Sequence, residues 1–481
     1  MSNMMLINGK WIGLSDEKPS TGVVNPATEE IFEHIPQADA DDIKKAIDAA
    51  ASAFADWSGL SYAQRGEYLK KAAAIANERR NEIGRLMTME MGKPLAEAVG
   101  EVEKAAKSLL YYAEEGERVY GRIISDQSRC FQSHVTYYPV GPVAAIIPWN
   151  YPIELMAWKA CAALTAGCTM VIKPASITPL SSSAFCRCLS DAGFPDGVIN
   201  LVFGSGSVIG EHLISDKRIK KVAFTGSTEV GKKIVQQCAA NMTKYSAELG
   251  GHCPMIVGKS ADIDSAASDA ARRTFRNMGQ ICIAINRIYV HSSIHDAFVE
   301  KMKEKTEELI IGNSLTTEGV NLGPMADKNG LIKIKEQITD ALGKGAVCAT
   351  GGSVPENQTK GYFFKPTILT NVNHDMLVMK EESFGPIVGV MSFETSEEAV
   401  ELANDTNYGL AAYVQSNDYY ETEYFIENLS AGNVAVNNPD AGVMNAPYGG
   451  WNDSGDGYEH GPEGLFGYLK IKQIRKRIRK S

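Results

Sequence analysis

The sequence lacks the long apolar segment that a membrane-spanning protein requires. Across 481 residues, the longest apolar stretches lie around 140–147 and 160–172, and Gly, Pro or polar residues interrupt both. They fall short of the ~20 consecutive apolar residues of a membrane helix. The first ten residues also lack the basic region and apolar core of a secretory signal. We therefore expect a cytoplasmic protein that does not span a bilayer.

Paired cysteines and an excess of basic charge are also absent. The 9 cysteines are scattered, with no CxxC pair and no histidine cluster beside them, which favours reduced thiols. The formal net charge of -10 disfavours binding to nucleic acid or to anionic membranes. Hydrophobic residues at 44% and charged residues at 22% are typical of a folded globular protein. A small molecule is therefore the expected partner.

The hydrophobic pattern divides the chain into helical and α/β segments. Residues 39–115 carry apolar side chains at helical spacing, which predicts helices. From residue 141 onward, short apolar runs alternate with segments of helix length, which predicts parallel sheets covered by helices. The expected strands are 143–147, 169–172, 198–203 and 221–225, then 255–257, 283–290, 386–391, 411–415 and 433–437. We predict an α/β fold with two doubly wound lobes.

Three further segments have the composition of strands but belong to neither lobe. They are 122–124, 131–138 and 468–474. The basic residues of the last segment alternate with isoleucines, which favours an edge strand with solvated charge over a nucleic-acid-binding tail. Because isolated strands need pairing partners, we expect a small β-element outside the two lobes.

A glycine-rich turn follows the strand predicted at 221–225. Gly226 and Ser227 lie between this strand and an expected helix that contains Gly231. Backbone N–H groups at a helix N-terminus bind anions such as a pyrophosphate. Ser227 is equally suited to cap the helix, and the two roles are compatible. An earlier GxGxxxG run at 204–210 is one residue longer than the usual dinucleotide fingerprint and is a weak signal.

Three other polar residues lie where strands are expected to begin or end. Cys282 precedes a strand-rich segment, where a thiol serves either as a nucleophile or as an inert buried side chain. Glu248 lies beside two glycines and suits a ligand-binding turn or a surface ion pair. Asn150 lies in a stiff turn between two prolines, and its amide suits an oxyanion donor or a helix cap.

These elements occur in the same order as in the NAD(P)-dependent aldehyde dehydrogenase superfamily, which the chain resembles over nearly its whole length. The motifs that carry the resemblance are 148–150, 173–175, 224–231, 248–251, 279–282, 381–386 and 404–410. The resemblance implies a dinucleotide-binding domain at 1–117 and 140–248, a catalytic domain at 249–448, and oligomerisation strands at 118–139 and 466–481. It also implies a homodimer or a homotetramer.

The resemblance implies roles for the three polar residues. The Cys282 thiolate would attack an aldehyde carbonyl, as the best side-chain nucleophile near neutral pH. The amide of Asn150 and the backbone N–H of Cys282 would hold the oxyanion. After hydride transfer to the cofactor, Glu248 would activate the water that hydrolyses the thioester. The implied reaction is the oxidation of an aldehyde to its carboxylic acid.

The resemblance also implies a binding site for NAD or NADP. Trp149 and Ser227 would lie by the pyrophosphate, in a wall that includes Gly226, Gly231 and Leu249. Lys173 and Ser176 would contact the adenosine ribose, and Glu382 and Phe384 the nicotinamide ribose. Many NAD-preferring members have Glu at the position of Ser176, so the serine permits NADP. The preference between the two cofactors stays open.

The substrate class rests on the segment 275–280. It resembles the succinate-semialdehyde dehydrogenase branch, in which the arginine at the position of Arg276 binds the distal carboxylate. A guanidinium suits a carboxylate or a sulfonate, and a structural role for Arg276 is equally compatible. Trp158 replaces a second arginine of that branch, which favours a bulkier or differently anchored tail. We expect an aldehyde bearing an anionic group, with neutral aliphatic or aromatic aldehydes as the alternative.

Three other enzyme classes fit the sequence less well. A cysteine hydrolase would pair Cys282 with a base such as His252 but would leave the glycine-rich turn and Glu382 unexplained. A CoA-acylating dehydrogenase would not need Glu248. The four-residue spacing of His291 and His295 is the sole hint of a metal, and a surface pair is the preferred interpretation. We therefore predict no metal site.

Overall fold

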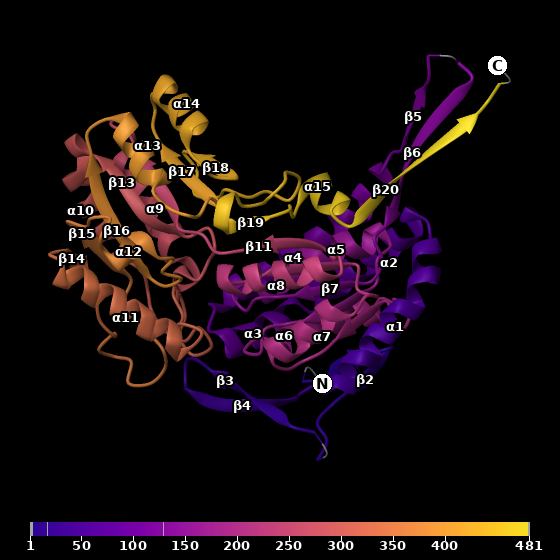
Figure 1. The fold of residues 1–481 in the computed structure, drawn as a ribbon. Coiled ribbons are helices and arrows are strands. Elements are labelled where there is room, and N and C mark those ends of the chain that lie inside the picture. The colour runs from indigo at the N-terminus through magenta and orange to yellow at the C-terminus, as the bar shows by residue number, and fades with distance from the viewer. Residues whose placement is uncertain (1–2, 17, 128, 480–481) are drawn as a thin grey trace.

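The computed structural model describes residues 3–16, 18–127 and 129–479. Two α/β lobes lie side by side, and a smaller sheet extends away from the first of them (Figure 1). This arrangement confirms the predicted fold class. The strands expected from short apolar runs are all present, with boundaries that differ by up to three residues.

The first lobe contains an eight-stranded sheet with a parallel centre and antiparallel edges. In spatial order its strands are β19 (Gly455–Asp456), β11 (Lys244–Glu248), β10 (Lys221–Thr225), β7 (Val143–Ile146), β8 (Met170–Lys173), β9 (Ile199–Leu201), β1 (Met5–Ile7) and β2 (Lys10–Ile12). Its helices are α1 (Ala40–Gly59), α2 (Tyr62–Glu78), α3 (Arg80–Met91), α4 (Leu95–Glu115), α5 (Pro152–Ala166), α6 (Pro179–Asp191), α7 (Gly206–Ser215) and α8 (Thr228–Ala240).

Helix α1 illustrates how the sequence specifies these helices. Asp39 and Asp42 form a capping box at its start, which satisfies backbone donors that no helical carbonyl reaches. Ile43, Ala46 and Ile47 are buried on one face at helical spacing. The apolar periodicity of residues 39–115 therefore predicted these helices correctly.

The second lobe contains a seven-stranded sheet. In spatial order its strands are β14 (Val347–Thr350), β15 (Thr367–Thr370), β16 (Ile387–Phe393), β13 (Ile285–His291), β12 (Cys253–Val257), β17 (Ala411–Gln415) and β18 (Asn433–Val436). Its helices are α9 (Ile263–Phe275), α10 (His295–Glu307), α11 (Lys328–Gly343), α12 (Leu377–Lys380), α13 (Ser396–Asn404) and α14 (Tyr419–Asn428), with α15 (Gly461–Phe466) on the return to the first lobe. The edge strand β14 and its neighbour β15 were not predicted.

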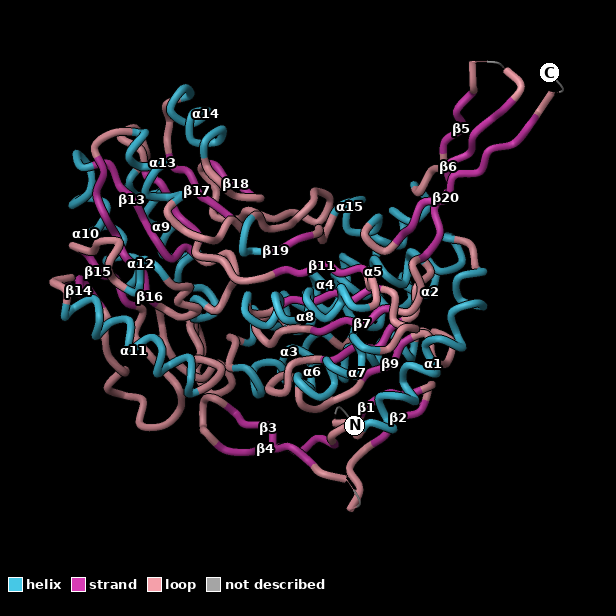
Figure 2. Tube along the Cα trace, viewed as in Figure 1, coloured by secondary structure: helices cyan, strands magenta, loops and turns pink. Residues whose placement is uncertain are grey.

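Two small sheets complete the fold. The hairpin of β3 (Ser20–Asn25) and β4 (Glu30–Pro36) reaches the second lobe, where the backbone N–H of Tyr362 donates to the carbonyl of Pro26. Strand β20 (Leu469–Arg477) pairs antiparallel with β6 (Phe131–Pro139), which pairs with β5 (Arg122–Ser125). Figure 2 shows these three strands projecting from the first lobe. The segments predicted as strands outside the lobes therefore pair with one another.

Candidate active site

The carboxyl ends of four parallel strands meet at one edge of the first sheet. Thr225 of β10 lies opposite Glu248 of β11, and Ile146 of β7 lies opposite Lys173 of β8. In open α/β sheets, ligands bind outside this edge. Parallel pairing therefore brings together residues that lie far apart in the sequence.

A backbone-strained loop of the second lobe carries Cys282 towards this edge. Asn277, Met278 and Gly279 all have positive φ angles, of 50°, 58° and 68°. A β-carbon on Gly279 would lie 2.2 Å from the carbonyl oxygen of Gly385, so only glycine fits there. The cysteine follows this turn and precedes β13, as the sequence predicted. Strain of this kind is concentrated at functional sites.

Asn150 lies opposite the loop that carries Cys282 and is fixed by buried ionic groups. Its amide Nδ2 donates to the carbonyl of Gln280 at 3.1 Å, and its own carbonyl accepts from the Lys93 ammonium at 2.8 Å. Lys93 also forms a buried ion pair with Glu101. Helix α5 begins after Tyr151 without a side-chain cap, so Asn150 is not a helix cap.

Two cavities meet at Cys282. One is open to solvent, has a volume of about 650 Å³ including its solvent-open part, and is lined by residues that include those of α5 and of the segment 440–460. The other is also open to solvent, has a volume of about 720 Å³ measured in the same way, and is lined by residues at the edge of the first sheet and of the second lobe. Among the described residues, Asn150 and Cys282 are the two that line both cavities. The thiol therefore lies where contents of the two cavities can touch.

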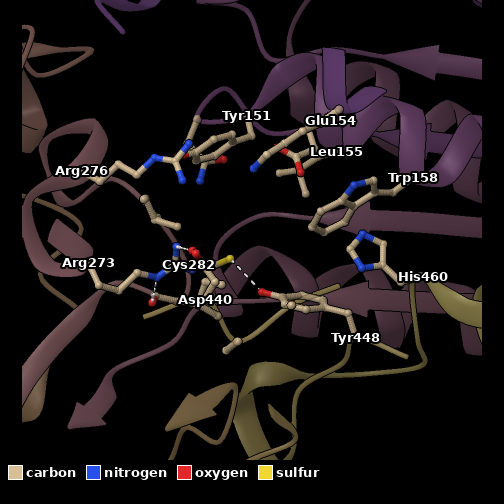
Figure 3. Close-up of a pocket in the computed structure, with 16 residues that line it drawn as sticks. Tyr151, Glu154, Leu155, Trp158, Arg273, Arg276, Cys282, Asp440, Tyr448 and His460 are labelled. Carbon is tan, nitrogen blue, oxygen red and sulfur yellow. Dashed lines mark hydrogen bonds and ion pairs between the residues drawn. The ribbon is translucent and has the colours of Figure 1, made fainter. Parts of the chain in front are cut away.

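The thiol of Cys282 has one side-chain hydrogen-bond partner in the described chain. Burial raises the pKa of this thiol to about 11, partly offset by a hydrogen bond with Tyr448. The Tyr448 hydroxyl lies 3.3 Å from Sγ, as Figure 3 shows. The backbone N–H of Cys282 has no acceptor among the described residues, so it is available to an oxyanion beside the Asn150 amide.

Glu248 lies next to the site but lines neither cavity. The side chain is 3% exposed, and neither carboxylate oxygen has a hydrogen-bond partner. Burial raises the pKa of Glu248 well above its ordinary value, and the nearby Glu459 raises it further. In this conformation the group is therefore stabilised in its protonated form.

The cavity at the sheet edge brings together most of the predicted cofactor residues. Its lining includes Trp149, Gly226, Ser227, Leu249, Glu382 and Phe384. The rings of Trp149 and Phe384 meet edge to face, with centroids 5.4 Å apart. Ser227 occupies the N-cap position of α8, but its side chain makes no capping hydrogen bond. Its hydroxyl is therefore available to a ligand.

Glu382 extends its carboxylate between the lobes, against a pair of glycines. Its Oε1 accepts from the backbone N–H of Gly251 at 3.0 Å. A β-carbon on Gly250 would lie 2.7 Å from Oε2, so a larger residue would displace this carboxylate. Burial raises the pKa of Glu382. Hydrogen-bond donors such as ribose hydroxyls would stabilise its carboxylate form.

Three predicted cofactor residues lie outside the wall of this cavity. Lys173 is 6% exposed, and burial lowers its pKa to about 8. No described carboxylate lies within ion-pair distance of its ammonium, so the residue fits a site for oxygen-rich ligands. Ser176 is exposed, and its hydroxyl donates to the carbonyl of Gly204 at 3.4 Å. Gly231 packs against Leu249. These groups fit a dinucleotide that extends along the sheet edge.

The other cavity contains both predicted substrate residues. Figure 3 shows Arg276 and Trp158 on opposite sides, with the Cys282 sulfur between them. The Nε of Arg276 donates to Glu97 at 2.8 Å, and the Tyr151 hydroxyl donates to the same oxygen at 2.8 Å. The two terminal nitrogens of Arg276 have no partner among the described residues.

Several side chains of this cavity were not predicted as site residues. His460 and Tyr448 pack against Trp158 with ring centroids 4.0 Å and 5.4 Å away. Arg273 and Asp440 also line the cavity and lie 3.6 Å apart. Tyr448 lies in the segment 447–457, whose glycines make it recognisable in the sequence. The sequence does not indicate where the side chain of Tyr448 points.

The residues of the alternative enzyme classes lie elsewhere. His252 lines neither cavity at Cys282. His291 and His295 contact their neighbours Ser293 and Asp296 at 2.8 Å and 2.9 Å. Residues 3–16, 18–127 and 129–479 contain no cluster of three or more His, Cys, Asp or Glu side chains suited to a metal. Within the same ranges, no helix combines the length and apolar character needed to cross a membrane.

Comparisons with known proteins identify the family of the chain. Residues 11–474 match the aldehyde dehydrogenase family. The chain is 41% identical over 469 residues to a succinate-semialdehyde dehydrogenase (NADP(+)) of Escherichia coli, covering 98% of this chain and 96% of the relative. It is 41% identical over 474 residues to a 3-sulfolactaldehyde dehydrogenase of Pseudomonas putida, covering 98% and 97%.

A solved structure shows the same fold. An aldehyde dehydrogenase from Brucella melitensis biovar abortus superposes with a TM-score of 0.96 at 40% identity, covering 99% of this chain and 98% of that one. The chain therefore belongs to the aldehyde dehydrogenase family and is an NAD(P)-dependent oxidoreductase that acts on aldehydes.

Proposed function

We propose that the chain oxidises an aldehyde bearing a carboxylate or sulfonate to its acid, with Cys282 as nucleophile. The observation that carries this proposal is the position of Arg276. Its guanidinium lines the cavity that also contains the thiol, and its terminal nitrogens are unpaired among the described residues. Two parallel N–H donors match the two oxygens of a carboxylate or a sulfonate.

The charge balance of the cavity supports an anionic substrate. Lys104, Arg273 and Arg276 line it, against the carboxyl groups of Glu154 and Asp440 in its wall and of Glu97, which pairs with Arg276. Burial raises the pKa of Glu154, which favours its neutral form. Asp440 also pairs with Arg272 at 2.9 Å. The remaining positive charge attracts an anion into a site that is partly shielded from water.

In the proposed mechanism, the thiolate of Cys282 attacks the aldehyde carbon. A C–S bond forms, and the carbonyl oxygen takes the electron pair of the broken π bond. The backbone N–H of Cys282 and the Asn150 amide donate to this oxyanion. Because Lys93 and Gln280 fix Asn150 before the substrate arrives, little reorganisation is needed during attack.

The dinucleotide would be held by residues of the other cavity. Glu382 is placed to accept ribose hydroxyls, Ser227 and the start of α8 to bind phosphate, and Lys173 with Ser176 to contact the distal ribose. When bound, NAD(P)+ accepts the hydride that leaves the former aldehyde carbon. We leave the choice between NAD and NADP open, because Ser176 places no carboxylate near a 2′-phosphate.

Glu248 is proposed as the base for thioester hydrolysis. Its buried carboxyl has no partner and lies outside both cavities, so the side chain must turn to reach the water that attacks the thioester. The raised pKa of Glu248 suits a group that must take a proton from water and later release it. A CoA-acylating enzyme would have no use for this base.

The names of relatives support the proposed substrate class. Enzymes named for succinate semialdehyde and 3-sulfolactaldehyde are each 41% identical to this chain. Both names denote aldehydes with a distal anionic group. Trp158 and the neighbouring rings of Tyr448 and His460 favour neutral aromatic aldehydes as a second candidate, because they form an apolar wall opposite Arg276.

We also propose a homodimer or homotetramer that functions in the cytoplasm. The three-stranded sheet exposes Ile123, Ile124 and Ile471 at 62%, 49% and 67%, an apolar surface that supports assembly through residues 118–139 and 466–481. The 9 cysteines are scattered along the chain without a CxxC pair, which favours a reducing compartment. We propose, from the family resemblance, that residues 1–117 and 140–248 form the dinucleotide-binding domain and that residues 249–448 form the catalytic domain.

Reduction of the cofactor, followed at 340 nm, tests the proposal. The panel contains succinate semialdehyde, sulfoacetaldehyde, short neutral aldehydes and aromatic aldehydes, each with NAD and with NADP. We expect the highest kcat/KM for the anionic aldehydes and no activity in Cys282→Ala. Higher kcat/KM for the neutral aldehydes would refute the substrate class, and activity that persists in Cys282→Ala would refute the mechanism.

A further inference from the structure

We propose that the Tyr448 phenol donates a hydrogen bond to the Cys282 thiolate and holds it ready for attack. This inference rests on the proposed role of Cys282 as the nucleophile. The hydroxyl of Tyr448 lies 3.3 Å from Sγ and has no other hydrogen-bond partner among the described residues. Figure 3 shows the phenol directed at the sulfur. No other described side chain is placed to donate to this sulfur.

The backbone of Tyr448 is fixed before any ligand binds. Its N–H donates to the carbonyl of Glu459 at 2.8 Å, and its carbonyl accepts from the N–H of Glu459 at 2.8 Å. Glu459 is anchored in turn by the buried ammonium of Lys159 at 2.5 Å. This reciprocal pair leaves little freedom for the segment that carries the phenol.

The ring of Tyr448 is equally confined. It packs against Trp158 with centroids 5.4 Å apart and against His460 with centroids 5.7 Å apart. His460 has a positive φ of 61°, a conformation that disfavours residues other than glycine. The surrounding structure thus holds His460 in a strained conformation, and the His460 ring packs against the phenol ring that contacts the thiol.

The direction of the hydrogen bond follows from acidity. Burial, with the nearby Cys282, raises the pKa of Tyr448 well above its ordinary value. The phenol therefore keeps its proton at neutral pH. A thiolate is a pure acceptor and therefore takes the hydrogen bond from the phenol. The bond stabilises the charged sulfur in a cavity whose burial otherwise opposes ionisation.

A hydrogen bond to a charged group shifts the pKa of that group by about one to two units. Losing it makes the thiolate rarer but intrinsically more nucleophilic, with a Brønsted coefficient of about 0.4–0.5. Together these effects predict a roughly 3- to 10-fold slower reaction of Cys282 in Tyr448→Phe at neutral pH. A more acidic phenol should have the opposite effect.

The test is the rate of Cys282 alkylation by iodoacetamide in the full-length protein, followed by peptide mass spectrometry. The variants are Tyr448→Phe, and proteins with mono- or difluorotyrosine at position 448, which keep the shape and increase the acidity of the phenol. Tyr289→Phe is the matched control, because it removes a buried phenol that contacts His374 at 3.0 Å rather than the thiol.

We expect the alkylation rate to increase from phenylalanine to tyrosine to the fluorotyrosines, with no change in Tyr289→Phe. A purely structural role for Tyr448 would give equal rates for tyrosine and its fluorinated forms, and that result would overturn the proposal. Turnover measured after complete alkylation separates the two hypotheses. If the alkylated wild type stays active, Cys282 is not the nucleophile and the proposed function fails as well.

Discussion

Replacement of Arg276 by methionine is the sharpest test of substrate recognition. Methionine keeps much of the aliphatic stem and removes the guanidinium. The terminal nitrogens of Arg276 are unpaired among the described residues, so the wild type is expected to use them for the anionic tail. Charge-assisted hydrogen bonds contribute about 1.5–3 kcal/mol, which corresponds to a loss of about 10- to 150-fold in kcat/KM.

The ion pair with Glu97 adds a second effect of the same sign. The Nε of Arg276 holds the Glu97 carboxylate at 2.8 Å, and the Glu97 side chain is only 13% exposed. In Arg276→Met, this carboxylate is left without its cation and repels the substrate anion. Arg276→Lys, which retains a charge but loses the planar fork, should therefore be impaired less than Arg276→Met.

Steady-state assays with succinate semialdehyde and with a neutral aldehyde of similar length measure these effects. We expect the loss for the anionic aldehyde alone, and the reciprocal variant Glu97→Gln should lower its KM because the cation is no longer neutralised. Equal losses for both aldehydes in Arg276→Met would show that Arg276 has a structural role, and the reasoning would be refuted.

Three further predictions concern other parts of the site. Glu248→Gln should still form the thioester and show a burst of reduced cofactor in stopped-flow experiments, but its steady-state turnover should fall about 10²- to 10⁴-fold. In the wild type, the hydrolysis rate should increase as the pH passes through the raised pKa of Glu248, and this increase should be absent in the variant. A wild-type pH profile in Glu248→Gln would contradict the proposed role. Lys173 is cationic below its pKa of about 8, so NADP affinity, measured by fluorescence titration, should weaken from pH 7 to pH 9 in the wild type. This pH dependence should be absent in Lys173→Met. Lys93→Met should lower the free energy of unfolding by about 3–5 kcal/mol, because Glu101, which is 2% exposed, is left buried without its cation. Urea denaturation measures this loss. The double variant Lys93→Met with Glu101→Leu should recover most of it.

Strong periodicity made much of the fold predictable. The central strands of both lobes are buried apolar runs, and the helices of residues 39–115 repeat apolar residues every three or four positions. Strand β19 has two residues, Gly455 and Asp456, and is defined by backbone pairing with β11. Strand β14 has one exposed residue, three of intermediate burial and none that is buried. Such edge strands have no hydrophobic pattern, so sequence alone does not reveal them.

The site was predictable where motif order carried the information. Asn150 and Cys282 come together through loops whose sequences are distinctive, and most of the cofactor residues line one cavity. The pairing of Arg276 with Glu97 joins residues 179 positions apart, and the contact of Tyr448 with Cys282 joins residues 166 apart. Both depend on side-chain directions that are set by packing between distant elements. Periodicity and propensity contain no such information.

The junction of the two cavities has a consequence for how enzymes of this shape diverge. Among the described residues, the two walls have only Asn150 and Cys282 in common. Mutations at 440–442 or at the α5 positions that line the first cavity, Glu154, Leu155 and Trp158, can therefore remodel one wall while the wall of the other cavity stays intact. After gene duplication, few substitutions are needed for activity on a different aldehyde, because the residues shared by the two cavities are inherited unchanged.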